Sequence, residues 1–154
     1  MAAKELKVGD IAPDFQAKNE NGELLKLSDY LGKKVILFFY PKDNTPGCTT
    51  ESCNFRDHYE DLQEKGFEVI GVSVDSEASH QRFKAKHKLP FTLISDTEKE
   101  LVTLYGVWKE KSLFGKKYMG TLRTTFVIDE KGKIISIIDK VKNSEATQQI
   151  LESI

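Results

Sequence analysis

A short apolar run followed by a helical pattern constrains this chain most. Residues 34–40 read Lys-Val-Ile-Leu-Phe-Phe-Tyr, which is apolar throughout after its lysine. A run of this length and composition predicts a strand that is buried on both faces of a sheet. Phe55, Tyr59 and Leu62 then recur at helical spacing before Gly66, which predicts an amphipathic helix with a glycine stop. The sequence therefore predicts a buried strand, a loop and a helix in succession.

Thr45 and Pro46 mark the start of this helix. Threonine is a common N-cap residue, and proline is favoured at the first helical position. Cys48 then falls in the first turn and on the apolar face, two turns before Phe55. The unpartnered N–H groups and the positive dipole end of a first turn favour a thiolate. We therefore expect Cys48 to be a reactive nucleophile, and the alternative is that it is a small buried hydrophobe.

Cys53 lies on the polar face of the same predicted helix. Five helical residues rise about 7.5 Å and turn the side chain about 140°, which puts the two Cα atoms roughly 8–9 Å apart. This exceeds the ~7 Å limit for a disulfide, so Cys48 and Cys53 can bond only if the helix start unwinds. The spacing favours a redox-switched pair over a structural disulfide. The alternative is that Cys53 is an exposed spectator thiol.

The stretch 40–53, Tyr-Pro-Lys-Asp-Asn-Thr-Pro-Gly-Cys-Thr-Thr-Glu-Ser-Cys, strongly resembles the peroxiredoxins. The proline, threonine and cysteine of that family match at Pro41, Thr45 and Cys48. The second cysteine, Cys53, matches the bacterioferritin comigratory protein branch, also called the Q type. The resemblance extends over nearly the whole chain.

The resemblance implies a thiol peroxidase that reduces hydrogen peroxide and organic hydroperoxides. Cys48 would be oxidised to a sulfenic acid, and Cys53 would condense with it to give an intramolecular disulfide. Thioredoxin or a similar small dithiol protein would reopen that disulfide. No haem, flavin or metal cofactor is implied. The resemblance implies a monomer, because the resolving cysteine is internal, and leaves open a weak dimer through the edge after Pro41.

Three further residues have roles implied by the resemblance, each with an ordinary alternative. Thr45 would orient the peroxide, although its position alone favours an N-cap. Pro41 would shield the thiolate, or it simply ends the strand. Arg123 would hold the thiolate and a peroxide oxygen together, since a guanidinium is always charged and offers several donors; the alternative is a surface arginine. For Arg56 and Arg82 we expect surface positions.

Composition places the chain among ordinary globular proteins. Its 154 residues suit a single domain spanning 1–154, with 39% hydrophobic and 31% charged residues. A net charge of −1 argues against nucleic-acid or anionic-membrane binding. No apolar run approaches the ~20 residues that span a bilayer, and residues 1–7 show no hydrophobic signal region. We expect a cytoplasmic location, where two cysteines are more often catalytic or metal-binding than structural.

The remaining segments predict strands and helices around the central unit. They are an N-terminal hairpin (12–18 and 23–27), a helical turn (28–32), strands at 67–75 and 91–96, helices at 77–87 and 98–105, a hairpin (124–129 and 133–138) and a closing helix (145–154). Residues 108–120 are expected to form a surface loop. Parallel β-α-β units with an added antiparallel hairpin give a mixed sheet flanked by helices. The predicted fold is α/β and thioredoxin-like, with an N-terminal β-hairpin extension.

Two other functions compete with a peroxidase. A dithiol–disulfide oxidoreductase would normally carry a Cys-x-x-Cys motif, which this chain lacks. A redox-sensing or holdase module would change shape on oxidation without turning over peroxide. A zinc site made by the cysteines with His58, His80 or His87 is disfavoured, because no paired-ligand spacing is present.

Overall fold

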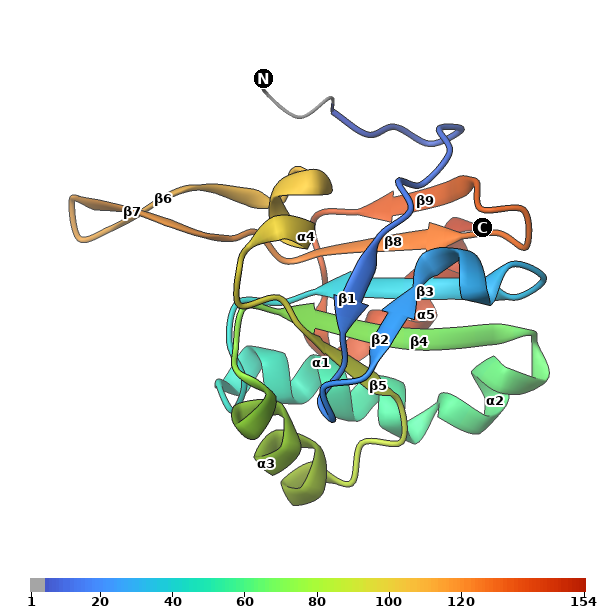
Figure 1. Cartoon of the computed structure of the whole chain (residues 1–154), viewed down its shortest axis with the longest axis horizontal. Coiled ribbons are helices and arrows are strands. Elements are labelled where there is room, and N and C mark those ends of the chain that lie inside the picture. Colours follow the sequence, from blue (N-terminus) through green and yellow to red (C-terminus); the bar gives the residue numbers. More distant parts are fainter. Residues whose placement is uncertain (1–4) are drawn as a thin grey trace.

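A five-stranded mixed sheet, in the order β5-β4-β3-β8-β9, forms the centre of the computed structural model, which describes residues 5–154 (Figure 1). Its strands are β3 (Lys34–Phe39), β4 (Phe67–Ser73), β5 (Thr92–Ser95), β8 (Thr124–Ile128) and β9 (Ile134–Ile138). Strands β3, β4 and β5 are parallel, and β8 and β9 are antiparallel to their neighbours. The apolar run of the sequence is therefore the central strand, as predicted.

Strand β3 supplies two apolar cores because its side chains alternate between the faces of the sheet. Val35, Leu37 and Phe39 pack into the core beneath the N-terminal hairpin. Ile36 and Phe38 pack into the core beneath the helix that carries the cysteines. All five side chains are essentially inaccessible to solvent. This double burial explains why the strand lacks the polar alternation of a half-exposed strand.

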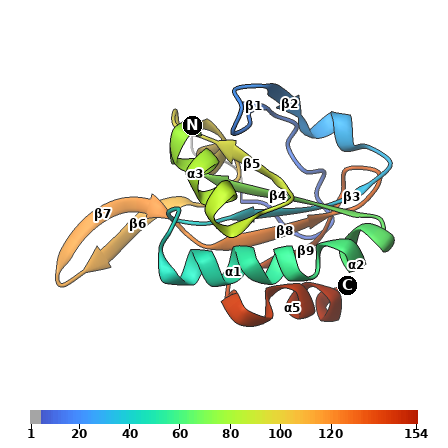
Figure 2. The ribbon, with the colours of Figure 1, turned by 90° about the horizontal axis from the view of Figure 1, so that it is seen from below.

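Helices and a small hairpin cover the two faces of the sheet. Helices α1, α2 and α5 form a layer against one face, while the β1–β2 hairpin lies on the other (Figure 2). Helix α3 packs beside the edge strand β5. The bounds of these elements are α1 (Pro46–Asp57), α2 (Tyr59–Glu64), α3 (Glu77–His87), α4 (Glu100–Leu104), α5 (Ala146–Ser153), β1 (Gln16–Lys18), β2 (Leu24–Lys26) and the 3-10 helices η1 (Leu27–Tyr30) and η2 (Asn143–Glu145).

The predicted α/β, thioredoxin-like architecture with its mixed sheet and N-terminal hairpin is confirmed. The hairpin turns at Gly22, whose φ of +76° is a left-handed conformation that glycine adopts without strain. Residues 1–4, which open the segment expected to lack a signal region, lie outside the described part of the chain. Within residues 5–154, no helix is both long and apolar enough to cross a membrane.

The prediction of a surface loop over 108–120 is wrong. This segment forms an antiparallel ribbon of β6 (Trp108–Leu113) and β7 (Lys116–Thr121), which projects from the body of the protein (Figure 1). The two-residue turn has positive φ at both Phe114 (51°) and Gly115 (79°), as a type I′ turn requires. Both faces of the ribbon are largely exposed, so the sequence lacks the apolar alternation by which strands are recognised.

The predicted helix running to Gly66 is instead two helices separated at His58. The imidazole Nδ1 of His58 lies 2.8 Å from the carbonyl oxygen of Asn54, which the backbone N–H of His58 also reaches at 3.2 Å. The side chain therefore competes for the carbonyl that would continue the helix. Helix α2 then resumes at Tyr59.

Candidate active site

Cys48 is the third residue of α1, where the sequence predicts it. Its thiol is free and only 1% of the residue is exposed. Pro46 occupies the first helical position, so the unpaired N–H groups of the first turn surround the cysteine. The guanidinium Nη2 of Arg123 donates a hydrogen bond to Cys48 Sγ at 3.2 Å. Cys48 and Arg123 are thus brought together across 75 residues of sequence.

The sheet explains how Arg123 reaches the thiol. Strand β8 runs antiparallel to β3, with Thr124 opposite Phe39 at the end of the central strand. Arg123 immediately precedes β8, so it lies at the same end of the sheet as the loop that leads into α1. Its side chain is 20% exposed, which rules out the alternative of a freely solvated surface arginine.

Glu51 holds the other side of the guanidinium. Arg123 Nη1 donates to Glu51 Oε1 at 2.8 Å, and the Glu51 side chain is fully buried. Its second oxygen, Oε2, has no hydrogen-bond partner among the described residues. The planar guanidinium therefore joins a carboxylate and the cysteine sulfur in one fixed arrangement.

Burial and the neighbouring charges act against each other in this cluster. Loss of hydration raises the pKa of Glu51 from 4.5 to about 7, although the charge and hydrogen bond of Arg123 act in the opposite direction. Burial lowers the pKa of Arg123, but Glu51 and Cys48 outweigh it, so the pKa of the guanidinium is raised and its charge is secure. On β6, burial and the charge of Arg123 lower the pKa of Lys111.

Gly47 makes room for the arginine. A Cβ at this position would lie 2.9 Å from Asn143 Nδ2 and 3.3 Å from Arg123 Nη2. The first distance is shorter than real Cβ contacts allow. Any larger residue would therefore push Asn143 or Arg123 away from the start of α1.

Thr45 occupies the N-cap position, but its side chain does not cap the helix. The backbone is extended there (φ −85°, ψ 151°), and the carbonyl of Thr45 accepts the N–H of Thr49. The hydroxyl Oγ1 instead donates to the carbonyl oxygen of Lys42 at 2.8 Å. The prediction of a side-chain cap is wrong, because the hydroxyl is directed toward the loop before the helix and accepts no N–H of the first turn.

Pro41 and Cys53 lie where the sequence places them. Pro41 follows the central strand after one intervening residue, Tyr40, and is half-buried. Cys53 is a free, half-buried thiol in the second half of α1. The helix runs unbroken through both cysteines, whose thiols are both free.

Sequence reasoning missed Glu51 and Gly47. Glu51 follows Cys48 by three residues and precedes Phe55 by four, so it falls on the apolar face of the predicted helix. An acid on the apolar face needs a buried partner, and Arg123 was already expected at the site, so the sequence could have indicated this ion pair. Gly47 carried no comparable signal, since its role depends on the side chains of Asn143 and Arg123, which are distant in sequence.

Comparison with known proteins agrees with this geometry. Residues 8–137 match the model of the AhpC/TSA family. The chain is 48% identical over 149 residues to "Peroxiredoxin Bcp" of Bacillus subtilis, covering 97% of this chain and 95% of the relative. It is 42% identical over 146 residues to "Peroxiredoxin Bcp" of Escherichia coli, covering 95% and 94%.

Solved structures show the same fold. A cysteine-to-serine mutant of PrxQ from Xylella fastidiosa superposes with a TM-score of 0.90 at 31% identity, covering 97% of this chain and 96% of that chain. BcpB from Mycobacterium tuberculosis gives 0.85 at 32% identity, covering 97% and 96%. A third structure, of the bacterioferritin comigratory protein from Xanthomonas campestris, concerns alkyl peroxide reduction and gives 0.85 at 33% identity, covering 90% and 88%.

Proposed function

Because the chain belongs to the AhpC/TSA family and is a thiol peroxidase of the peroxiredoxin type, we propose that Cys48 is its peroxide-reactive thiol and Cys53 its resolving thiol. The observation that carries this assignment is the hydrogen bond from Arg123 to Cys48 Sγ at 3.2 Å. Cys53 has no such donor among the described residues. A thiol that is buried at a helix start beside a permanent cation is the better nucleophile.

In the first step the Cys48 thiolate attacks one oxygen of the hydroperoxide. The S–O bond forms as the O–O bond breaks, and the departing oxygen takes a proton to leave as water or an alcohol. Arg123 stabilises the charge that develops on this oxygen, because its donors are already fixed by Glu51. The product is the Cys48 sulfenic acid.

Thr45 and Pro41 complete the peroxide pocket in this proposal. The Thr45 hydroxyl donates its hydrogen bond to the Lys42 carbonyl. The lone pairs of Thr45 Oγ1 therefore remain available to accept a hydrogen bond from the peroxide O–H. Pro41 has no N–H group, so it adds bulk beside the thiol without adding a competing donor.

In the second step the Cys53 thiolate attacks the sulfenic sulfur and releases water, leaving a Cys48–Cys53 disulfide. Helix α1 must unwind locally for this bond to form, because its residues are helical from Pro46 to Asp57. A thioredoxin-type dithiol then reduces the disulfide and is itself oxidised, which restores both thiols.

The finer features of partners and organisation extend this proposal. The substrates are hydrogen peroxide and organic hydroperoxides, a breadth supported by the alkyl peroxide activity named for the Xanthomonas relative. The reductant is thioredoxin, and the protein works in the cytoplasm as a single domain over 1–154. It acts as a monomer, because both reacting cysteines belong to one helix.

A peroxidase assay on cysteine variants tests the assignment. Wild type should consume peroxide with thioredoxin, thioredoxin reductase and NADPH, and Cys48→Ser should not. With one equivalent of peroxide, Cys53→Ser should accumulate a sulfenic acid that a dimedone trap labels at Cys48. Labelling of Cys53 in Cys48→Ser at a similar rate would reverse the two roles. Reduction of insulin disulfides without peroxide would instead favour a dithiol oxidoreductase.

A further inference from the structure

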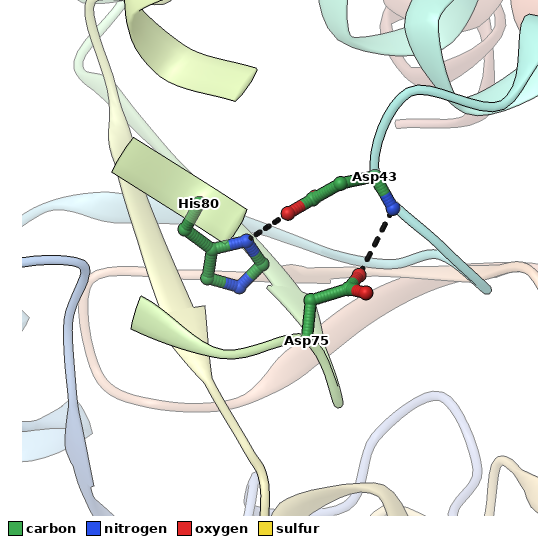
Figure 3. A group of neighbouring side chains, drawn as sticks. All are labelled: Asp43, Asp75 and His80. Carbon is green, nitrogen blue, oxygen red and sulfur yellow. Dashed lines mark hydrogen bonds and ion pairs between the residues drawn. The ribbon is translucent and has the colours of Figure 1, made fainter. Parts of the chain in front are cut away.

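A second buried polar cluster lies beneath the loop that connects β3 to α1. It consists of Asp43 from that loop, Asp75 after β4 and His80 from α3 (Figure 3). Asp43 and His80 are buried, and His80 Nδ1 lies 2.7 Å from Asp43 Oδ2. The ligand-type atoms of the three residues lie within 4.8 Å of one another, as in metal sites, but hydrogen bonds already occupy them.

The hydrogen-bond partners of His80 indicate which of its ring nitrogens carry protons. Nε2 lies 2.8 Å from the carbonyl oxygen of Ile94, which can only accept, so Nε2 carries a proton. Nδ1 faces the carboxylate of Asp43, which also accepts hydrogen bonds from the hydroxyls of Tyr40 (2.7 Å) and Ser79 (2.8 Å). Nδ1 is placed to donate to this carboxylate at 2.7 Å, so the contacts call for a proton on Nδ1 as well as on Nε2.

Burial lowers the pKa of His80, but the hydrogen bond and charge of Asp43, with further help from Ile94 and Asp75, outweigh it and raise the pKa. This direction agrees with the hydrogen-bond geometry. The contacts of its two ring nitrogens describe an imidazolium paired with a carboxylate, in a cluster whose charged groups are hydrogen-bonded.

One peptide plane links this ion pair to the peroxide pocket. The peptide between Lys42 and Asp43 donates its N–H to Asp75 Oδ2 at 2.9 Å. The carbonyl of the same peptide accepts the Thr45 hydroxyl at 2.8 Å. Because the six atoms of a peptide are coplanar, fixing its N–H and the Asp43 side chain also fixes the direction of the carbonyl that holds Thr45.

We propose that the charged pair of His80 and Asp43 is a positioning device for the peroxide pocket, which sets the orientation of the Thr45 hydroxyl through the Lys42–Asp43 peptide. The proposal rests on the role given to Thr45 above. Neither His80 nor Asp43 contacts the Cys48 sulfur, so their effect is on how the peroxide is held and not on the thiol itself.

Comparing two reactions of Cys48 tests whether the pair affects the holding of the peroxide and not the thiol itself. All variants carry Cys53→Ser, so that Cys48 is the single thiol. The second-order rate with hydrogen peroxide needs an oriented pocket, whereas alkylation by iodoacetamide needs only an accessible thiolate. His80→Gln and Asp43→Asn should each slow the peroxide reaction about tenfold, as expected when a positioned group moves slightly. Alkylation should change less than about twofold by the same reasoning, because Arg123 and the helix start remain in place.

The matched control is His87→Gln, which removes a histidine two turns later on the same helix, outside the cluster. It should leave both rates unchanged. In a Thr45→Val background, His80→Gln should have no further effect on the peroxide rate. A parallel fall of both rates in His80→Gln and Asp43→Asn, or an unchanged peroxide rate, would overturn the positioning role. After either of these contradicting outcomes, loss of peroxide reduction in Cys48→Ser would show that the assignment of Cys48 stands while the role of His80 falls.

A measurement on the unsubstituted protein does not depend on how the variants fold. Nitrogen-15 spectra at pH 7 should show both ring nitrogens of His80 protonated. A neutral imidazole, with one unprotonated nitrogen, would contradict the ion pair and with it the proposal.

Discussion

The two halves of helix α1 are held in the protein by different kinds of contact. The first half carries Cys48 and Glu51, both buried, and Arg123 binds them through a permanent charge. The second half carries Cys53 and Asn54, both half-buried, and the neutral amide of Asn54 attaches it to η2 and to the start of α5. A single helix thus has a first end fixed by a guanidinium between Glu51 and Cys48, and a second end where neutral amide bonds act beside the partly exposed Arg56.

This difference matches the two demands of the reaction. Peroxide attack needs a thiolate held in a fixed position, and separating a buried charged pair is costly, often by about 3–5 kcal/mol. Disulfide formation needs the helix to open, and each neutral hydrogen bond contributes only about 1 kcal/mol. The neutral hydrogen bonds of Asn54, next to Cys53, are therefore weaker restraints than the charged contacts around Cys48.

Breaking the charged end should have the largest effect. Arg123→Lys keeps one positive charge but loses the planar fork that reaches Glu51 and Cys48 together. The second-order rate of Cys48 oxidation by peroxide should fall by a factor of about 10²–10³, as for loss of a preorganised donor. Stopped-flow measurement on the reduced protein gives this rate directly.

Arg56→Lys is the matched control. Arg56 also lies on α1, but it binds the carbonyl of His87 and the carboxylate of Asp57, away from the thiol. It should react with peroxide at nearly the wild-type rate. An Arg123→Lys rate within a few-fold of wild type would show that charge alone, without the fork geometry, supports the reaction.

The start of helix α1 was predictable from the sequence, because the signals that define it are local. A buried strand, a proline at the first helical position and a cysteine two residues later define the helix start without reference to the rest of the chain. The partnership of Cys48 with Arg123 came from resemblance, because no local pattern links residues 75 positions apart. Only the antiparallel pairing of β8 with β3 brings them together.

The cluster around His80 was not predictable in the same way. His80 occurs on a helix rich in polar residues, so its spacing favours a solvated position. The burial of His80 depends on the packing of α3 beside β5 and on the contact of its imidazole with the loop residue Asp43. The β6–β7 ribbon was missed for a related reason, since both its faces are exposed and no burial pattern marks its strands.

The pH dependence of stability should sharpen the description of the charged end. The pKa of Glu51 is raised from 4.5 to about 7, chiefly by burial. Between these values the unfolded state has lost the proton that the folded state keeps, so the free energy of unfolding should decrease as pH rises from about 4.5 to about 7. Glu51→Gln cannot ionise, so it should lack this decrease.

Urea unfolding of the reduced proteins at pH 5.0 and 7.5 measures the effect. The stability of wild type relative to Glu51→Gln should drop by about 1–3 kcal/mol between these pH values, given about 1.4 kcal/mol for each unit of pKa shift. Glu60→Gln, an exposed acid on α2, should show no such drop. Parallel pH profiles for wild type and Glu51→Gln would mean that Arg123 keeps Glu51 ionised throughout.

Removing the hydrogen bonds of Asn54 should have the smallest effect, and it should speed a reaction step where the Arg123 change slows one. Asn54 Nδ2 donates to the carbonyl of Ser144 at 2.9 Å, and its Oδ1 accepts the N–H of Thr147 at 2.8 Å, at the start of α5. Asn54→Ala removes both bonds, which should make opening of α1 easier by about 1–2 kcal/mol. The Cys48–Cys53 disulfide should then form about 5–30 times faster after one equivalent of peroxide, since each 1.4 kcal/mol is a tenfold factor. Rapid quenching with an alkylating reagent and mass spectrometry follows this step.

Asn54→Asp separates the two bonds, because it keeps the acceptor for Thr147 and loses the donor to Ser144. Its rate of disulfide formation should lie between the rates of wild type and Asn54→Ala. Alanine is also a better helix former than asparagine, which by itself would slow opening. Faster disulfide formation in Asn54→Ala would therefore identify the attachment to α5, and not helix propensity, as what restrains Cys53. Quicker resolution leaves the Cys48 sulfenic acid less time to meet a second peroxide, so Asn54→Ala should also resist overoxidation to the sulfinic acid.

Hydrogen exchange should show amide protection over residues 49–56 in reduced wild type, weaker protection in reduced Asn54→Ala, and no protection in the disulfide form of either protein. Equal protection in the reduced and oxidised wild type, with the disulfide confirmed by mass, would mean that α1 need not unwind at all.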